Sequence, residues 1–233
     1  MNRIARFKDL GLIGYQDATK YQEKIFREIV ENKLRNQKLP ENKKVVLPNH
    51  LLFCEHPHVY TLGKSGSVNN LLINTLQLKQ IDAEFFRTNR GGDITYHGPG
   101  QIVGYPVFDL DFFGLSLKEY IDRLEEAVIL TLQHFSIGAE RLKGATGVWL
   151  DIHDKTNIRK ICAIGVRSSH WVTMHGFAFN VNTDLSYFGY INPCGYTDKV
   201  VTSLEKELGK KQDISHVKSI LLSELSEVFG FML

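Results

Sequence analysis

The sequence predicts an α+β fold in which a mixed, largely antiparallel β-sheet is flanked by helices. Three strand-like runs, at 147–150, 160–166 and 171–181, follow one another with only polar turns between them, which favours antiparallel pairing. The helical patterns are few and lie far apart along the chain. The regular alternation of strand and helix that is typical of a parallel sheet is missing from the sequence.

The N-terminal half predicts one long helix among short strands. Residues 11–15 form a short strand-like run, and Asp17 is placed to cap a helix whose apolar positions recur at Tyr21, Ile25 and Ile29. A buried strand is expected within 45–56, where the sequence reads VVLPNHLLFCEH. Further β-rich runs, broken by Gly and Pro, lie at 85–88, 94–96 and 102–108.

The C-terminal half predicts two amphipathic helices. Ser116 and Glu119 have the spacing of a capping box, and Gly138 is the expected end of the helix that follows. One face of this helix is apolar, at Leu117, Ile121, Leu124, Val128, Leu132 and Phe135. The last helix shows the same periodicity at Val217, Ile220, Leu221, Leu225 and Val228.

Composition excludes several classes of protein. The chain has 233 residues, of which 43% are hydrophobic and 23% charged, so we expect one folded domain over residues 1–233 and not a disordered chain. The net charge of +2 gives no sign of a nucleic-acid partner. The 3 cysteines are too few and too uneven for a disulfide scaffold, which favours a reducing compartment. With no apolar run of membrane-spanning length and no signal-like start, we expect a cytoplasmic protein without a membrane partner.

The segment RGGDITYHGPGQ, residues 90–101, is the first candidate for chemistry. Paired glycines let a backbone bend sharply and approach a ligand closely. Tyr96 and His97 add polar groups. The segment matches neither of the common phosphate-binding glycine motifs. The alternative is structural, with two tight turns around one strand.

Two of the cysteines are expected to be buried thiols. Cys54 lies in the apolar run LLFC, although its alternation with His56 and His58 leaves a metal site open as a second interpretation. On a regular strand Cys162 would share one face with Lys160 and Ile164, while Ile161 and Ala163 would take the other.

Cys194 differs because it lies in a loop-like segment, INPCGYTDK, between Pro and Gly. Loops expose reactive groups more often than strands do. A thiol attacks as the thiolate and therefore needs a neighbouring cation or base. The residues alone leave Lys160, His97 and His175 open as that partner.

Together these segments resemble the lipoyl(octanoyl) transferases, which belong to the biotin/lipoate protein ligase superfamily. The matching stretches are GLIGYQDATKYQEKIF, LLFCEHPHVYTLG, RGGDITYHGPGQIVGYPVFDL, GVW with RKICAIGVRSSHWVTMHGFAFNVNTDL, and INPCGYTDKVVTSL, which run from about residue 11 to 204. The resemblance implies a catalytic domain like that of the biotin/lipoate ligases, over residues 1–233.

The resemblance also implies a reaction. An octanoyl group would move from octanoyl-acyl carrier protein to a lysine of lipoyl domains in 2-oxoacid dehydrogenase complexes or of the glycine-cleavage H protein. Cys194 would hold the group as a thioester, and Lys160 would act as base or thiolate stabiliser. Because a thioester is already activated, neither ATP nor a metal is expected, and ping-pong kinetics follow from the two half-reactions. The substrate-binding positions implied are Arg90, Gly91, Gly92, Asp93, Ile94, Thr95, Tyr96, His97, Ala163, Ile164, Gly165, Gly176, Phe177 and Ala178.

Two further expectations accompany this resemblance. Tyr96, Ile164, Phe177 and Phe179 are expected either to form walls of an acyl tunnel or to belong to the ordinary core. The basic segment 33–44, with Lys33, Arg35, Lys38, Lys43 and Lys44, is either a solvated loop or a surface that speeds encounter with acidic partner proteins.

Three rival activities remain open from the sequence. An ATP-dependent lipoate–protein ligase would form an acyl-adenylate and would not need Cys194. A non-catalytic acyl-binding module would bind the octanoyl group without covalent capture. A hydrolase would release the acyl group as free acid.

Overall fold

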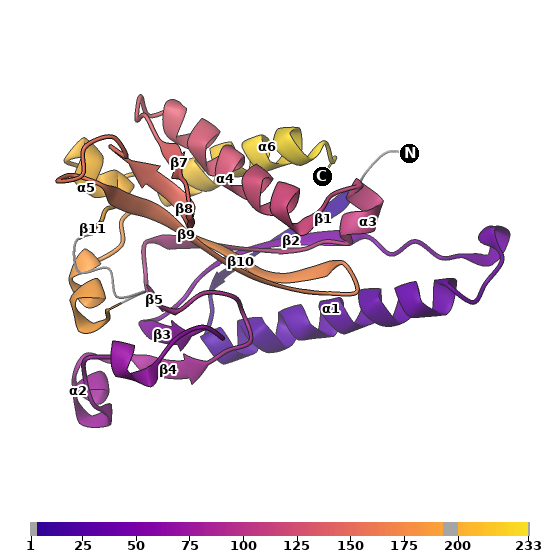
Figure 1. Ribbon diagram of the computed structural model, residues 1–233, viewed down its shortest axis with the longest axis horizontal. Helices are drawn as coiled ribbons and strands as arrows, with labels where there is room; N and C mark the ends of the chain where they lie inside the picture. The colour runs from indigo at the N-terminus through magenta and orange to yellow at the C-terminus, as the bar shows by residue number, and fades with distance from the viewer. Residues whose placement is uncertain (1–3, 193–199, 233) are drawn as a thin grey trace.

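The computed structural model describes residues 4–192 and 200–232, and its main feature is a large, mixed β-sheet (Figure 1). The strand order is β1 (Ala5–Leu12), β2 (Asn49–Glu55), β6 (Gln101–Val107), β10 (Val172–Asn180), β9 (Arg159–Ser169), β8 (Ala145–Leu150) and β7 (Glu140–Leu142), with β11 (Val200–Val201) paired to β9. The pairs β1–β2 and β11–β9 are parallel, and the other five are antiparallel. The predicted fold class is confirmed.

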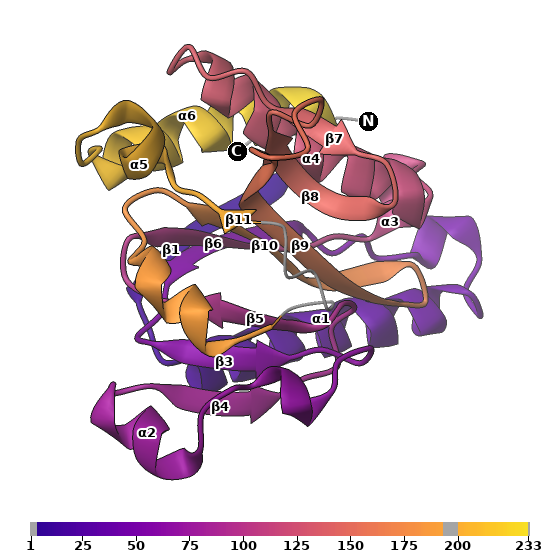
Figure 2. The same ribbon diagram turned by 60° about the vertical axis from the view of Figure 1, so that its left-hand side comes forward.

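A second, three-stranded sheet lies on the same side of the large sheet as the long helix α1 (Figures 1 and 2). It consists of β4 (Glu84–Arg87), β3 (Val59–Leu62) and β5 (Ile94–His97), with β3 in the middle. Around it lie the short helix α2 (Thr75–Gln80) and the 3-10 turns η2 (Val68–Asn70) and η3 (Leu185–Tyr190). The predicted strands at 85–88 and 94–96 correspond to β4 and β5.

Helices cover both faces of the large sheet (Figure 1). The helix α1 (Tyr15–Asn36) packs its apolar stripe on β6 and β10, whereas α4 (Leu117–Gln133) and α6 (Ile214–Phe229) pack together on the opposite face. The predicted capping box of α4 is present, because Ser116 accepts the Glu119 N–H and the Glu119 side chain accepts the Ser116 N–H. The remaining elements are η1 (Glu41–Lys43), α3 (Leu110–Phe113) and α5 (Leu204–Leu208).

Some predicted boundaries were wrong. The first strand ends at Leu12, and α1 already begins at Tyr15 with Gly14 as its N-cap, so Asp17 lies in the first turn and does not cap the helix. A carboxylate in the first turn still interacts favourably with the free N–H groups there, which explains the misleading signal. The helix α4 ends at Gln133, before Gly138, in a turn where Ser136 has φ 58°.

The basic segment 33–44 lies at the end of α1 far from the small sheet (Figure 1). Lys33 is largely buried and forms ion pairs with Asp109 and Asp111. Lys44 pairs with Glu41. Lys33 and Lys44 are thus paired within the chain.

No helix in the described part of the chain combines the length and the apolar character needed to cross a bilayer.

Candidate active site

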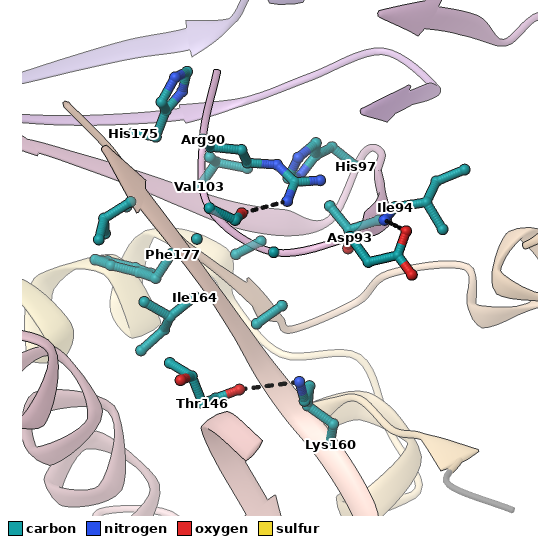
Figure 3. Close-up of a pocket in the computed structure, with 18 of the residues that line it drawn as sticks. Arg90, Asp93, Ile94, His97, Val103, Thr146, Lys160, Ile164, His175 and Phe177 are labelled. Carbon is teal, nitrogen blue, oxygen red and sulfur yellow. Dashed lines mark hydrogen bonds between the residues drawn. The ribbon is translucent and has the colours of Figure 1, made fainter. Parts of the chain in front are cut away.

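A cavity of about 540 Å³ is lined by residues of both sheets, of the loop that holds Arg90 and of the first turns of α4 (Figure 3). This volume lies within the range of about 300–1,000 Å³ that is usual for small-molecule sites. The segments that the sequence singled out converge here, although they are far apart in the chain. The predicted residues that line the cavity are Arg90, Gly91, Gly92, Asp93, Ile94, Thr95, His97, Lys160, Ala163, Ile164, Gly165, Gly176, Phe177 and Ala178.

The floor of the cavity is made of small residues that lie side by side on three strands. Ala163 on β9 is in register with Ala178 on β10, which is in register with Val103 on β6. The next row pairs Gly165 with Gly176. Since successive side chains of a strand alternate between its faces, these residues present a flat face without bulky side chains toward the cavity. The result is a slot suited to a thin, flexible chain.

The loop of Arg90, Gly91 and Gly92 forms the opposite wall. The Gly91 N–H donates to the Val166 carbonyl at 2.8 Å, which fixes the loop over β9. A Cβ atom on Gly165 would come within 2.9 Å of the Gly91 carbonyl oxygen, so only glycine fits beneath the loop. Gly92 has φ 82°, a conformation that favours glycine. The two glycine pairs therefore allow the backbones to approach closely.

Arg90 is held at the cavity by the small sheet. Its Nη2 donates to the Thr61 carbonyl at 2.6 Å and to Thr61 Oγ1 at 2.9 Å, and the residue is largely buried. Asp93 lies on the same wall, where its Oδ1 accepts the Ile94 N–H at 2.6 Å and its Oδ2 accepts from Asn70 Nδ2 at 2.6 Å. Both charged side chains are thus oriented by groups outside the cavity floor.

Lys160 enters the cavity because β9 carries a β-bulge. Val148 is in register with Cys162 and Trp149 with Lys160, so Ile161 is an extra residue. Ile161 and Cys162 both point into the core beneath α4, whereas Lys160 lines the cavity. The prediction that Lys160 shares a strand face with Cys162 was wrong, because a bulge resets the alternation of side chains. Without this bulge the ammonium group would point toward the core.

Two contacts orient the half-buried Lys160. Its Nζ donates to the Thr146 carbonyl at 3.0 Å (Figure 3) and lies 4.4 Å from the centre of the Trp149 ring. The second contact is a cation–π interaction. The role of Trp149 was not found from the sequence, because its position beside Lys160 depends on the strand register.

Cys194 lies outside the described residues. The described residues on either side are attached near the cavity. The Asn192 N–H donates to the Asn70 carbonyl at 2.8 Å, and Val201 pairs with Lys160 on β9. The Thr202 N–H donates to the Lys160 carbonyl at 2.9 Å.

The two cysteines expected in the core are confirmed there. Cys54 and Cys162 are fully buried, and burial raises the pKa of both thiols well above the ordinary value. His56, the nearest histidine to Cys54, has Nδ1 at 2.7 Å from the Ile13 carbonyl and Nε2 at 2.7 Å from the Tyr105 hydroxyl. Among residues 4–192 and 200–232, no three His, Cys, Asp or Glu side chains are grouped so that they could hold a metal ion.

The histidines of the cavity are neutral. Burial, with His56 and Arg90 nearby, lowers the pKa of His97 to about 3, and its Nδ1 lies 2.8 Å from Gln101 Oε1. Burial together with the nearby Arg90 also lowers the pKa of His175 to about 3. Groups with such low pKa values are poor proton acceptors at neutral pH. His97 and His175 therefore supply no positive charge at neutral pH.

Two aromatic residues do not form walls of the cavity. The Tyr96 hydroxyl lies 2.7 Å from His58 Nδ1, and the ring stacks on Tyr187 with centroids 5.0 Å apart. Phe179 is fully buried in the core beneath α4 and α6. For these two the core interpretation is correct. The cavity gains walls that the sequence analysis missed, namely Tyr15, Val103, Tyr105, Leu117 and Ile121.

An ion pair fixes the strand that follows the Cys194 segment. Arg159 donates from Nε and Nη2 to the two carboxylate oxygens of Glu207, each at 2.7 Å. The same carboxylate accepts the hydroxyl of Thr202, next to β11. Glu207 thereby connects α5 to both β9 and β11, beside Lys160.

Replacing Glu207 by glutamine is expected to lower the free energy of unfolding by about 1–3 kcal/mol at neutral pH. The Arg159 hydrogen bonds hold the pKa of Glu207 below its ordinary value of 4.5. A carboxylate with a lowered pKa stabilises the fold above its unfolded pKa, and this contribution is lost as the pH falls through the folded value. Urea unfolding of the wild type and of Glu207→Gln from about pH 7 to pH 3 measures the free energy of unfolding of each. The difference between the two free energies should shrink below pH 4.5. A difference that is independent of pH would contradict this account.

Comparison with known proteins places this site in a family. A model of the lipoyl protein ligase A/B catalytic domain matches residues 15–226. The chain is 53% identical to an octanoyltransferase of Cytophaga hutchinsonii, over 98% of this chain and 93% of that protein. It is 54% identical to an octanoyltransferase of Parabacteroides distasonis, over 97% of this chain and 98% of that protein.

Solved structures share the fold at low sequence identity. A bipartite lipoate protein ligase from Thermoplasma acidophilum aligns with a TM-score of 0.69 at 16% identity, over 99% of this chain and 85% of that one. A lipoate-protein ligase A bound with ATP aligns with a TM-score of 0.65 at 16% identity, over 99% of this chain and 87% of that one. The sequence motifs, the family match over residues 15–226 and the nearly full-length relatives agree, and the chain belongs to the lipoyl protein ligase A/B catalytic domain family.

Proposed function

We propose that this protein transfers an octanoyl group from octanoyl-acyl carrier protein to a specific lysine of lipoyl-accepting domains, the first step of protein lipoylation. The observation that carries the proposal is the narrow slot with small residues on its floor and Lys160 at one end. Relatives of about the same length and more than 50% identity are named octanoyltransferases, which supports the choice of acyl group.

The slot can supply the binding energy for an eight-carbon chain. Octanoyl has six methylenes, and burying each contributes about 0.8 kcal/mol, or on the order of 5 kcal/mol together. The described lining is mostly apolar, with Val103, Ile164 and Phe177 among its side chains. Lys160 lies at one end of the slot, where the thioester would lie.

The chemistry consists of two acyl transfers through Cys194. The first is a thioester exchange, and the second forms an amide. The Cys194 thiolate attacks the carbonyl carbon of the donor thioester, and the bond to the phosphopantetheine sulfur breaks as that sulfur leaves as a thiol. The acceptor lysine amine then attacks the enzyme thioester, an amide forms and the Cys194 thiol is released. Lys160 stabilises the thiolate as an ammonium ion, and its amine can take the proton of the attacking nucleophile. Neither step needs ATP or a metal, because the donor is already activated.

The acceptors we propose are lipoyl domains of 2-oxoacid dehydrogenase complexes and the glycine-cleavage H protein. The Thermoplasma acidophilum ligase with the same fold was solved as part of a study with its E2 lipoyl domain, which supports this class of acceptor. We place the reaction in the cytoplasm, where reducing conditions keep Cys194 a free thiol.

Intact-mass measurement after incubation with octanoyl-acyl carrier protein alone tests the proposal. We expect the mass of one octanoyl group to be added to the wild-type protein. Cys194→Ala should abolish the adduct, whereas Cys162→Ala should keep it because Cys162 is buried in the core. Adding a lipoyl domain should then release the protein unmodified, with octanoyl on the domain.

Each rival activity gives a different result in this experiment. Transfer that requires ATP, magnesium and free octanoate would show a ligase. Tight octanoyl binding without a covalent adduct would show an acyl-binding module, and octanoic acid released without an acceptor would show a hydrolase. An adduct that persists in Cys194→Ala would remove Cys194 as the nucleophile.

A further inference from the structure

Glu125 is a buried carboxylate to which the proposed chemistry gives no role. It lies on the buried face of α4 together with Leu124 and Val128, and its side chain is only 7% exposed. A carboxylate in the core is costly unless hydrogen bonds and a counter-ion satisfy it. Glu125 is outside the cavity lining, so contact with the acyl chain does not explain its position.

The Glu125 carboxylate is held at both of its oxygens. Oε1 accepts the Gly147 N–H of β8 at 2.8 Å, in a buried hydrogen bond. Oε2 lies 3.1 Å from Arg141 Nε on β7. Burial raises the pKa of Glu125, and the Gly147 N–H and Arg141 oppose this shift. The carboxylate is therefore fixed in orientation against the backbone of β8.

The peptide unit that Glu125 contacts also holds Lys160. The Thr146 carbonyl belongs to the same peptide bond as the Gly147 N–H, and it accepts a hydrogen bond from Lys160 Nζ at 3.0 Å (Figure 3). The carbonyl and the N–H of a trans peptide point in opposite directions, so this peptide lies between the carboxylate and the ammonium group. Hydrogen bonds arranged in such a chain polarise and strengthen one another.

A β-bulge places this peptide where both side chains reach it. The register of β8 against β7 shifts at Thr146 and Gly147, which are extra residues of β8. Bulges of this kind are common next to active sites, where they redirect groups of the strand. Gly147 has φ 122°, and a Cβ atom there would lie 2.5 Å from the Cys162 carbonyl oxygen and 3.3 Å from Lys160 Cε. The backbone of the bulge therefore lies directly against the lysine side chain.

We propose that Glu125 is a positioning residue that fixes Lys160 through the Thr146–Gly147 peptide. Its carboxylate accepts the Gly147 N–H and thereby holds the Thr146 carbonyl where that carbonyl binds the Lys160 ammonium group. The consequence for catalysis rests on the proposed octanoyl transfer, in which Lys160 assists Cys194.

The variants Glu125→Asp and Glu125→Gln separate the hydrogen bond from the charge. Glu125→Asp keeps the charge beside Arg141 but withdraws the carboxylate from Gly147, whereas Glu125→Gln keeps the length and an oxygen that accepts the N–H. Since a misplacement of about 1 Å can cost about 10²-fold, we expect Glu125→Asp to lower kcat of octanoyl transfer about 10- to 100-fold. Glu125→Gln should keep kcat within about threefold of the wild type, and KM for octanoyl-acyl carrier protein should change less than about twofold in both variants.

A double-mutant cycle shows whether Glu125 acts through Lys160. In the Lys160→Met background, Glu125→Asp should lower kcat by less than about twofold, because no ammonium group is left to position. An equal loss from Glu125→Asp in both backgrounds would show a purely structural role and overturn the inference.

Glu126→Gln is the matched control. Glu126 is the next residue of α4 and also pairs with Arg141, at 2.6 Å, but it is half-exposed. This variant should keep kcat within about twofold of the wild type. A full loss in Glu125→Gln with wild-type kcat in Glu125→Asp would mean that the charge matters and the hydrogen bond to Gly147 does not, which would also overturn the inference.

Trp149 fluorescence tests the position of Lys160 without any transfer reaction. Because Lys160 Nζ lies 4.4 Å from the centre of the Trp149 ring, the emission should respond to the ammonium group. In a Trp171→Phe background, which leaves Trp149 as the sole tryptophan, Glu125→Asp should shift the emission in the same direction as Lys160→Met does, and Glu125→Gln should not. If the wild type transfers no octanoyl group, the proposed function fails, and this spectrum still decides the role of Glu125. An emission that stays unchanged in Glu125→Asp would overturn the inference.

Discussion

Replacing Lys160 by methionine is expected to lower kcat/KM for octanoyl transfer by about 10²–10⁴-fold, the usual contribution of a positioned acid–base group. Methionine keeps an unbranched stem but removes the charge and the hydrogen bond to the Thr146 carbonyl. In the proposed mechanism Lys160 favours the Cys194 thiolate, so less of the thiol is ionised at neutral pH once Lys160 is replaced. The rate of acyl-enzyme formation, followed by intact mass, should therefore recover partly as the pH is raised toward 9.

Lys155→Met is the matched control for this variant. Lys155 is exposed in the turn between β8 and β9, close to Lys160 in the sequence but outside the cavity lining. The Lys155→Met variant should transfer octanoyl at the wild-type rate. If Lys160→Met forms the acyl-enzyme as fast as the wild type at neutral pH, Lys160 has no part in activating Cys194.

Periodicity and short motifs predicted the local features of this fold. The spacing of Ser116 and Glu119 predicted the capping box that the structure contains, and the apolar residues around Cys162 correctly indicated a buried thiol. These features depend on residues a few positions apart, so a sequence shows them directly. The segments of the slot were found through the resemblance, because their Gly and Ala residues show no chemistry until strands bring them together.

The parts that were not predicted depend on strand register. Lys160 points into the cavity only because Ile161 is an extra residue opposite β8, and a bulge has no reliable sequence signature. Trp149 contacts Lys160 only because of the strand register, although the two lie 11 residues apart along the chain. Tyr96 illustrates the opposite error, since its place in a motif suggested a cavity wall while its face of β5 belongs to another cluster. Register therefore decides which members of a motif line the cavity.

The slot itself can be closed from its floor. Replacing Ala163 by phenylalanine should place a ring in the cavity between the sheet and the loop of Arg90, Gly91 and Gly92, because Ala163 lies on the cavity face of β9 beside Ala178. The ring would exclude the acyl chain and remove the burial of six methylenes, on the order of 5 kcal/mol, so kcat/KM for octanoyl transfer should fall about 10³–10⁴-fold.

The comparison that decides this prediction uses a shorter donor with the same variant. An acetyl thioester has no chain to bury, so the wild type should already transfer acetyl slowly. Ala163→Phe should transfer acetyl at a rate within about tenfold of the wild-type rate for the same donor. The thermal midpoint should change little, because the cavity of about 540 Å³ has room for a ring without moving the strands. Equal losses for acetyl and octanoyl donors would mean that the ring disturbs Lys160 and not the slot. Undiminished octanoyl transfer would mean that the acyl chain lies elsewhere, and the floor of small residues would then need another explanation.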